Sequence, residues 1–552
     1  MLLVGINAKY IHSNLAIRYL SKVDTRCHFR EYSIADREET IAADLYKSGC
    51  RIFMFSCYIW NITHVLRVCE ILKKADSGLT LALGGPEVAF SAEACLCENQ
   101  QVDFVLCGEG ETSITAFVDA LQSGDFESVP GLYYRKNGTV AQSGLPSAEA
   151  DLEQLPFPYD DADMKNLQHR IVYFETSRGC PYRCAFCLSG GAGSLRFLPL
   201  HKVEQAIDFF ARHKVPLVKL VDRTFNADPH RALAIIEMIK QKNSGTTYHF
   251  EIRAESMTQA LIESLQTAPT GMFQLEIGVQ SVNPATLEKV NRKPQHEKLE
   301  QVVHALSQNN NIHLHLDLIA GLPGESFEAF VHSFHVLMGM RPHQLQLGFL
   351  KRLKGSTLQA PGSRFADFPP YEVICSDAMS YSELLRLKAA EDVLEKYYNS
   401  GMFEKTVPYI LETHYKNREF YFFDELASFL AMHRGTVGQK ALYETLYAFF
   451  EAHFADETVA HHLIFDYALR HRDYLSFMQP VPHLKEWAFA FLKDESLVST
   501  YFEKYVGEKP VILYKKLHFV PIGKRIFAFD YEGKACGVDV TEAFEAVRQH
   551  NL

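Results

Sequence analysis

The stretch VYFETSRGCPYRCAFCLSGG, residues 172–191, places Cys180, Cys184 and Cys187 within eight positions, directly after a short run of strand-forming residues. Thiolates are favoured ligands of iron–sulfur clusters and of zinc. A closed structural zinc site takes four ligands, and no histidine follows this loop at a suitable spacing. Three thiolates on a four-iron cluster leave one iron open to a substrate or cofactor. The spacing therefore indicates a cluster used for chemistry at that iron.

Length and composition are those of a multidomain globular protein. The chain has 552 residues, 47% of them hydrophobic and 22% charged, and a single core stops growing at ~250–300 residues. The net charge of −11 argues against a uniformly basic duplex-binding surface. No apolar run reaches the ~18 residues of a membrane span, and we find no secretory signal at the start. We expect a cytoplasmic location with reduced thiols.

Residues 1–141 alternate short apolar runs with helical patterns. Strand-like runs occur at residues 2–7, 51–60, 79–85 and 102–111, and two of them end in glycine turns. Strands alternating with helices indicate a parallel sheet covered on both faces, and such sheets bind ligands at the carboxyl ends of their strands. The expected fold of this part is α/β and Rossmann-like.

Residues 142–170 are rich in proline and acidic residues and carry little periodicity, so we interpret them as a linker. Six strand-like runs with intervening helical patterns follow, and they predict a partial (β/α) barrel over residues 171–360. Residues 361–552 have helical spacing and many aromatics, and short strand-like runs near the end. A mainly α-helical C-terminal domain is therefore predicted, with its aromatics packed between helices.

The cysteine loop, with Phe186 just before the last cysteine and RG before the first, resembles that of the radical S-adenosylmethionine (SAM) enzymes. The resemblance implies a [4Fe–4S] cluster held by Cys180, Cys184 and Cys187, with SAM chelating the open iron. Reductive cleavage of SAM would then give methionine and a 5′-deoxyadenosyl radical that abstracts hydrogen from an unactivated C–H. In this mechanism the cofactor does the difficult chemistry, and the protein binds and orients.

The SAM ammonium group needs acceptors, and its carboxylate needs a cation or N–H groups. Candidate side chains stand at the ends of predicted strands, where barrels bind ligands. QSVN (280–283) resembles the ending of the family's fifth strand, and LIAGLPGES (318–326), after Asp317, resembles its sixth-strand turn. The family's Gly-Gly-Glu motif is absent after the second strand, where VDRTFN stands. The SAM-binding candidates are Phe186, Gly190, Gly191, Asp222, Arg253, Glu276 and Gln280.

The turns LALGGPE (81–87) and LCGEGE (106–111) resemble those of the cobalamin-binding domain of cobalamin-dependent radical SAM enzymes. NAKYIHSNLAIRYL (7–20) resembles that domain's opening loop and first helix, and SCYIWN (56–61) its second strand and turn. No D-x-H-x-x-G motif is present, so we expect side chains near Tyr58 and Trp60 to cover the lower face of the corrin. The cobalamin-binding candidates are Asn7, His12, Ser13, Ser56, Tyr58, Trp60, Asn61, Gly84, Gly85, Pro86, Glu87, Gly108, Glu109 and Gly110.

Together the segments resemble a branch of the cobalamin-dependent radical SAM enzymes that carries an uncharacterised helical C-terminal domain. The resemblance implies a methyltransferase that methylates an unactivated carbon through the 5′-deoxyadenosyl radical and methylcobalamin. Two alternatives stay open: a rearrangement, cyclisation or oxidation without methyl transfer, and a non-catalytic corrinoid or redox sensor. No single general base can be chosen from the sequence.

The partners are predicted only in part. The chemistry implied by the resemblance needs an external electron donor of the flavodoxin or ferredoxin type. Basic runs such as KRLK (351–354) supply local positive charge that phosphates would need, but solvated lysines explain such runs equally well. The substrate, a small metabolite or an RNA nucleoside, stays undecided, and so does the oligomeric state.

Overall fold

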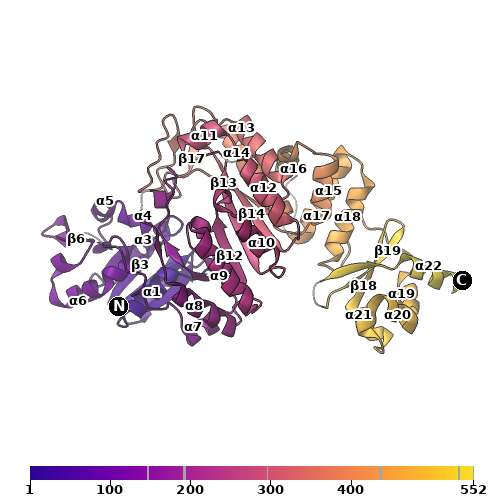
Figure 1. Ribbon diagram of the computed structural model, residues 1–552, viewed down its shortest axis with the longest axis horizontal. Helices are drawn as coiled ribbons and strands as arrows, with labels where there is room; N and C mark the ends of the chain where they lie inside the picture. The colour runs from indigo at the N-terminus through magenta and orange to yellow at the C-terminus, as the bar shows by residue number, and fades with distance from the viewer. Residues whose placement is uncertain (146–147, 191–193, 295, 434–437, 533–534, 551–552) are drawn as a thin grey trace. The chain divides into compact units, whose positions relative to one another are not determined.

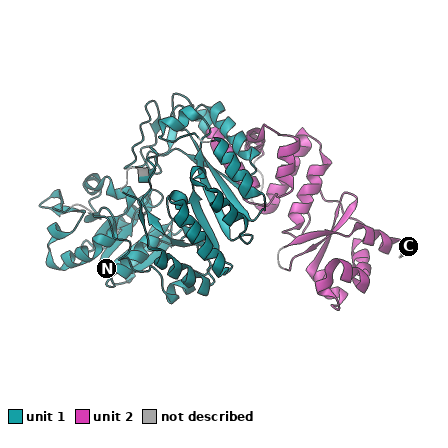
Figure 2. Ribbon diagram, in the orientation of Figure 1, with its two compact units in different colours: residues 1–384 teal, residues 385–552 magenta. Residues whose placement is uncertain are grey.

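The structure is a computed structural model of residues 1–552 that describes all of them except 146–147, 191–193, 295, 434–437, 533–534 and 551–552 (Figure 1). The chain forms two compact units, Met1–Leu384 and Leu385–Leu552 (Figure 2). The first unit contains two sheets that position the predicted sites. The second unit is described separately below.

The N-terminal sheet has seven strands in the order β2-β1-β3-β4-β5-β6-β7. The strands β1 to β5 pair in parallel, whereas β6 and β7 are antiparallel to their neighbours. The strands are β1 (Leu2–Asn7), β2 (His28–Ser33), β3 (Ile52–Ser56), β4 (Thr80–Gly84), β5 (Phe104–Leu106), β6 (Leu132–Lys136) and β7 (Thr139–Gln142).

Helices cover both faces of this sheet, so the side chains of β1 are buried on both sides. Leu2, Val4 and Ile6 pack against α2 (Glu38–Lys47), α3 (Ile62–Ala75) and α5 (Ala92–Glu98). Leu3, on the other face, packs against α1 (Leu15–Val23) and α6 (Ile114–Ser123). The strand order reverses between β1 and β3, and ligands of such sheets bind at the carboxyl ends beside the reversal. The predicted Rossmann-like fold is confirmed.

The described part of the segment predicted as a linker, residues 142–145 and 148–170, buries several side chains, among them Leu152, Leu155, Tyr159 and Met164. It contains the helix α7 (Asp161–Asn166), which begins with a capping box at Asp160. Arg18 of α1 is almost completely buried and reaches both Asp163 of α7 and Glu31 of β2, with 2.6 Å to each carboxylate. A buried guanidinium with two carboxylate partners holds this segment in a defined position.

The second sheet has six parallel strands in the order β15-β14-β13-β12-β11-β8, so the described strands form a partial barrel. All six correspond to the strand-like runs expected from the sequence. They are β8 (Val172–Phe174), β11 (Leu217–Leu220), β12 (Thr247–Ile252), β13 (Phe273–Gln280), β14 (Ile312–Ala320) and β15 (Gln344–Phe349).

The barrel strands carry apolar residues outward and polar residues inward. On β13, Phe273, Leu275 and Ile277 are buried, while the alternate residues are only partly buried. The helices that follow these strands in the chain lie along the outer face of the sheet (Figure 1). These helices include α8 (Leu200–Arg212), α9 (Pro229–Lys242), α10 (Gln259–Gln266), α12 (His296–Ser307) and α13 (Phe327–Gly339).

The strand numbering corrects two details of the resemblance. QSVN (280–283) ends β13, which is the fourth strand of the barrel counted from β8, and LIAGLPGES (318–326) follows β14, the fifth. Each motif was expected one strand later. A turn sequence shows that a strand has ended, but the number of preceding strands depends on their pairing in the sheet.

The second unit is mainly helical, as predicted. Its helices α16 (Glu419–Met432) and α17 (Gln439–His453) bury aromatic rings between them, with Phe422 and Phe449 fully enclosed. Other helices of this unit are α15 (Thr406–Thr413), α18 (Glu457–Ala468), α19 (Leu484–Lys493), α20 (Glu495–Phe502), α21 (Pro510–Lys516) and α22 (Thr541–His550). The strands β18 (Leu517–Ile522), β19 (Arg525–Asp530) and β20 (Cys536–Asp539) form an antiparallel sheet.

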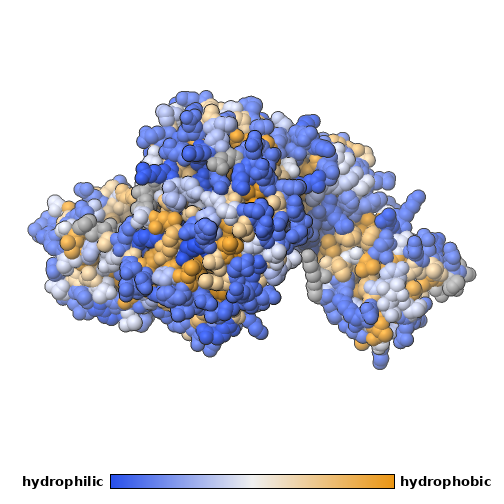
Figure 3. Space-filling view, viewed as in Figure 1, coloured by the Kyte–Doolittle hydropathy of each residue, from blue (hydrophilic) through white to orange (hydrophobic). Residues whose placement is uncertain are grey.

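The described residues include no helix that is both long enough and apolar enough to cross a membrane. Hydrophilic residues cover much of the face shown in Figure 3.

A buried carboxyl group joins the turns that follow β13 and β14. Glu325 is fully buried, and its Oε1 accepts a hydrogen bond of 2.5 Å from Ser281 Oγ. Burial raises the pKa of Glu325 to about 8, although the bond from Ser281 opposes this shift. An unfolded glutamate has a pKa of about 4.3. Between those values the folded state binds more protons, so the free energy of unfolding falls as the pH rises.

We therefore expect the free energy of unfolding to fall by roughly 1 kcal/mol per pH unit between about pH 5 and pH 8 because of this group. The substitution Glu325→Gln should remove that slope. Urea unfolding at several pH values measures the effect. The matched control is Glu328→Gln at an exposed site nearby, and an equal slope in wild type and Glu325→Gln would contradict the assignment.

Candidate active site

The three cysteines lie on one loop at the carboxyl end of the first barrel strand. The loop is framed by the antiparallel pair β9 (Ser177–Arg178) and β10 (Arg196–Phe197). Gly179 has φ +94°, and a Cβ there would stand 2.6 Å from the Ser194 carbonyl oxygen, so only glycine fits. Ala185 N donates to Val290 O at 3.0 Å and anchors the loop from the other side.

Two guanidinium groups lie beside Cys184. Arg253 Nη1 is 3.8 Å from Cys184 Sγ, and its guanidinium stacks 3.9 Å from the centre of the Tyr182 ring. Arg292 also interacts with Cys184, and its Nη2 donates to Gly278 O at 2.6 Å. Positive charge favours the thiolate form of cysteine. Three free thiols on one loop beside two cations fit a cluster with three thiolate ligands.

Arg292 was not among the candidates from the sequence. It follows the helix α11 (Pro284–Lys289) in the run VNRK, and only the folding of that helix back to the cysteine loop gives it a position in the site. It lines a small cavity of about 40 Å³ together with Glu255, Gly278 and Ser281.

Asp222, a SAM-binding candidate, is already engaged within the protein. Its two carboxylate oxygens accept from Thr176 N at 2.9 Å, from Thr176 Oγ1 at 2.7 Å and from Ser177 Oγ at 2.5 Å. Burial raises the pKa of Asp222, and these hydrogen bonds oppose the rise. The side chain holds the strand end from which the cysteine loop departs, so its contribution to SAM binding stays a prediction.

The remaining SAM candidates are placed differently from one another. Gln280 has φ +74° beside a bulge in β13, and Gly278 leaves room for its side chain. Glu276 faces the interior of the barrel, where Lys219 donates to it. Phe186 is partly buried beside Cys187. Gly190 ends the short helix η3 (Leu188–Gly190), and Gly191 lies outside the described residues.

The predicted cobalamin site lies at the carboxyl edge of the N-terminal sheet. Gly85 follows β4 with φ +109°, and a Cβ there would stand 2.6 Å from the Cys57 carbonyl oxygen. Tyr58 and Trp60 follow β3, with their rings stacked at 4.4 Å, and Trp60 is 45% exposed. The other cobalamin-binding candidates that lie at strand ends or in turns are Ser56, Gly84, Pro86, Gly108 and Gly110.

Several cobalamin candidates form hydrogen bonds within the protein, and their contacts with cobalamin stay a prediction. Asn61 is fully buried and donates from Nδ2 to Ile6 O and Ser56 O, at 2.9 Å each, which shapes the turn after β3. Asn7 Nδ2 donates to His12 O at 3.1 Å. His12 Nδ1 is 2.6 Å from Tyr173 Oη, and Ser13 Oγ donates to Ile171 O at 2.8 Å. His12 and Ser13 therefore join the sheet domain to the first barrel strand.

Both candidate glutamates of the glycine turns also have protein partners. Glu87 accepts from Tyr371 Oη at 2.5 Å and lies 3.1 Å from Lys354 Nζ. Glu109 pairs with Arg178 at 2.9 Å and with Arg196. Sequence reasoning did not identify these pairings because the partners lie 69 or more positions away in the chain.

We name the pairing of Arg178 with Glu109, Glu111 and Glu175 the arginine clamp. Arg178 stands two residues before Cys180, and its guanidinium is 2.9 Å from both Glu109 and Glu111 and 2.5 Å from Glu175. Burial tends to lower the pKa of Arg178, but the hydrogen bonds and negative charges of Glu175 and Glu111 together outweigh it, so that pKa is raised. The clamp fastens the cysteine loop directly to the LCGEGE turn of the sheet domain.

Removing the guanidinium would leave the partly buried carboxylates of Glu111 and Glu175 without their cation, while Glu109 would keep only Arg196. We expect Arg178→Ala to lower the free energy of unfolding by about 3–5 kcal/mol, as measured by urea denaturation. Arg178→Lys should recover only part of this loss, because a compact ammonium cannot bond three carboxylates as a guanidinium fork does. Arg183→Ala, on the exposed side of the same loop, is the matched control. Equal stability of Arg178→Ala and Arg183→Ala would show that the clamp is not a structural element.

Three family models match successive parts of the chain. The B12 binding domain matches residues 1–118, the Radical SAM superfamily matches residues 174–337, and a protein family of unknown function, DUF4080, matches residues 361–535. The matches follow the order in which the structure arranges the N-terminal sheet, the partial barrel and the C-terminal region.

Curated relatives resemble the first two parts. The chain is 29% identical over 315 residues to 2-(S-pantetheinyl)-carbapenam-3-carboxylate methyltransferase of Streptantibioticus cattleyicolor, covering 53% of this chain and 45% of that protein. It is 28% identical over 334 residues to the cobalamin-dependent radical SAM methyltransferase TokK of Streptomyces tokunonensis, covering 56% and 48%. The chain thus spans about half the length of these relatives.

A solved structure shares the fold. The radical SAM methyltransferase TsrM of Kitasatospora setae, solved with cobalamin and a [4Fe–4S] cluster bound, matches with a TM-score of 0.55 and 15% identity. The match covers 67% of this chain and 78% of that one. The predicted combination of a B12-binding sheet domain with a radical SAM barrel is therefore confirmed.

Proposed function

We propose that this chain is a cobalamin-dependent radical SAM methyltransferase that methylates an unactivated carbon atom, because its residues 1–118 match the B12 binding domain and its residues 174–337 match the Radical SAM superfamily. The arginine clamp is the observation that carries the proposal. It fastens the loop of Cys180, Cys184 and Cys187 to the LCGEGE turn of the B12-binding domain. A substrate held between the two can reach both cofactors. The names of the similar proteins support the same reading.

The side chains at the site indicate which part of the reaction the protein contributes and which part the cofactors contribute. When bound, the cluster and SAM supply a carbon radical, and cobalamin supplies a methyl carrier. The chain's own part is to hold and orient. Three thiols and Arg253 bind at the cluster end, Asp222 fixes the strand end beneath the cysteine loop, and the clamp keeps the two cofactor sites together.

The interior of the barrel indicates the character of the substrate. Lys219, His249 and Glu276 are polar, face this interior and bond with one another, and an apolar substrate would leave their remaining donors and acceptors without partners. We propose a polar substrate for this reason. Both a small metabolite and an RNA nucleoside meet the requirement, and an electron donor of the flavodoxin or ferredoxin type completes the proposal.

Loss of one cluster ligand tests the radical chemistry. We expect Cys184→Ala to abolish formation of 5′-deoxyadenosine after anaerobic reconstitution with iron, sulfide and a reductant. Binding of hydroxocobalamin should persist, because the B12-binding domain has its own core. Chromatography measures the first quantity and absorption spectroscopy the second. Cys375→Ala, away from the loop, is the matched control. Reductive cleavage of SAM at the wild-type rate by Cys184→Ala would refute the assignment.

Isotopic labelling tests the methyl transfer itself. Extracts of cells that lack the gene should contain the unmethylated substrate, and incubation with reconstituted enzyme and SAM carrying a deuterated methyl group should add that label to one compound. Mass spectrometry of small molecules and of RNA nucleosides detects it. A product that forms with 5′-deoxyadenosine but carries no label would instead establish a rearrangement, cyclisation or oxidation.

A further inference from the structure

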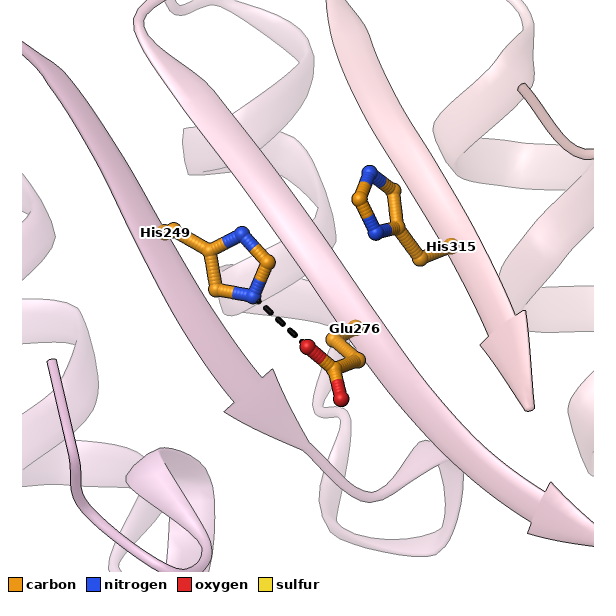
Figure 4. Close-up of side chains that lie close together, drawn as sticks. All are labelled: His249, Glu276 and His315. Atoms are coloured by element: carbon orange, nitrogen blue, oxygen red, sulfur yellow. Dashed lines mark hydrogen bonds and ion pairs between the residues drawn. The ribbon is translucent and has the colours of Figure 1, made fainter. Parts of the chain in front are cut away.

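Two imidazoles and a carboxylate meet inside the barrel, separate from the cysteine loop. His249 lies on β12, Glu276 on β13 and His315 on β14, and one ligand atom from each lies within 4.8 Å of the others. The three side chains come from adjacent strands and converge on one side of the sheet (Figure 4). None of them is a candidate ligand of the cluster.

The pleat of the sheet brings them together. Glu276 is the direct neighbour of His315 across the β13–β14 pair, and His249 is the direct neighbour of Gln274 on β13. Residues two apart on a strand share a face, so all three side chains point into the barrel. Each comes from the interior of a strand, where the backbone is held by hydrogen bonds on both sides.

We propose that His249, Glu276 and His315 bind a divalent first-row transition-metal ion. Two imidazoles and one carboxylate, with further positions open, form a recognised metal-binding combination. Imidazole and carboxylate ligands suit zinc, iron and manganese ions better than calcium or magnesium ions, which prefer oxygen ligands alone. The proposal concerns a second metal centre and does not depend on methyl transfer.

The spacing of the ligands agrees with this assignment. His249 Nε2 is 2.9 Å from Glu276 Oε2 and shares a hydrogen bond with it. Ligand atoms about 2.0–2.1 Å from a tetrahedral metal ion are separated from each other by about 3.3 Å. A metal ion would therefore take the place of the bridging proton with little movement of these two side chains. His315 needs the larger adjustment.

Groups around the three ligands support them as an outer shell. Lys219 Nζ donates to Glu276 Oε2 at 3.0 Å, and His249 Nδ1 faces Gln274 Oε1 at 3.4 Å. Such contacts orient metal ligands. The ammonium of Lys219 is balanced by Glu251, 3.9 Å away. Asp317 on β14 also has a buried oxygen, Oδ1, without a hydrogen-bond partner. A further carboxylate oxygen is therefore available to a cation inside the barrel.

An ion at this position would face the interior of the barrel through its open coordination positions. A metal ion can orient a substrate and polarise an oxygen atom bound to it. The class of ligand that fits is a small molecule with a carboxylate, hydroxyl or carbonyl oxygen. Such an ion would bind and orient, whereas the cluster would serve the redox chemistry.

The test removes the cluster first, because its iron would hide a second metal. The full-length variant C180A/C184A/C187A is titrated with Co²⁺, followed by visible absorption, and with Zn²⁺ in competition. We expect stoichiometric binding. His249→Ala, His315→Ala or Glu276→Gln in this background should weaken it by at least about 10-fold, the loss seen even for outer-shell mutations. His304→Ala, exposed on α12, is the matched control and should not change the affinity.

A second measurement covers the case of a variant that does not fold, which circular dichroism would show. In the cluster-free parent, Zn²⁺ should protect His249 and His315, but not His304, from acylation by diethyl pyrocarbonate, as read by mass spectrometry. Absence of stoichiometric Co²⁺ binding, or binding that survives all three substitutions, would overturn the proposal. So would equal acylation of His249 and His315 with and without Zn²⁺.

Discussion

The arginine clamp is the interaction on which the arrangement of the first unit depends. One guanidinium, two residues before the first cysteine, pairs with three carboxylates, those of Glu109 and Glu111 in the LCGEGE turn and of Glu175 directly after β8. Removing one partner of a buried charge group leaves an uncompensated charge, which costs far more than an exposed pair contributes. The cysteine loop and the LCGEGE turn are therefore held together by charge, with Arg196 and the contacts of His12 and Ser13 in support.

The alternation of the barrel strands has a second consequence. On β12, β13 and β14, one face supplies Phe250, Leu275 and Leu316 to the core against the helices. The opposite face supplies His249, Glu276 and His315 to the interior. The same two-residue period thus places apolar side chains on the outer face for packing and polar side chains in the interior, where they can bind a ligand. Because the strands are fixed by packing on their outer faces, the inner side chains are held in place before any ligand arrives.

Several features followed directly from local sequence. The six barrel strands and four of the five parallel strands of the first sheet come from apolar runs, whereas the polar strand β2 (HFREYS) was not anticipated. The cysteine loop comes from a spacing that few other structures need. The partners of individual side chains were not visible in the sequence. Glu109 pairs with Arg178 and Arg196, and Glu87 with Lys354 and Tyr371, while the cobalamin contacts of both glutamates stay predictions. Residues 142–170 looked like a linker because their buried side chains do not follow a helical or strand period.

The sequence by itself determined the six barrel strands, four strands of the first sheet and the three thiols, because each depends on residues that are neighbours in the chain. Tertiary structure alone decided which charged residues meet. Arg178 and Glu109, Glu87 and Tyr371, and His249 and His315 are separated by 66 to 284 positions. Electrostatic pairing depends on distance in space, and that distance is set by the packing of the sheets and is not written in any local pattern.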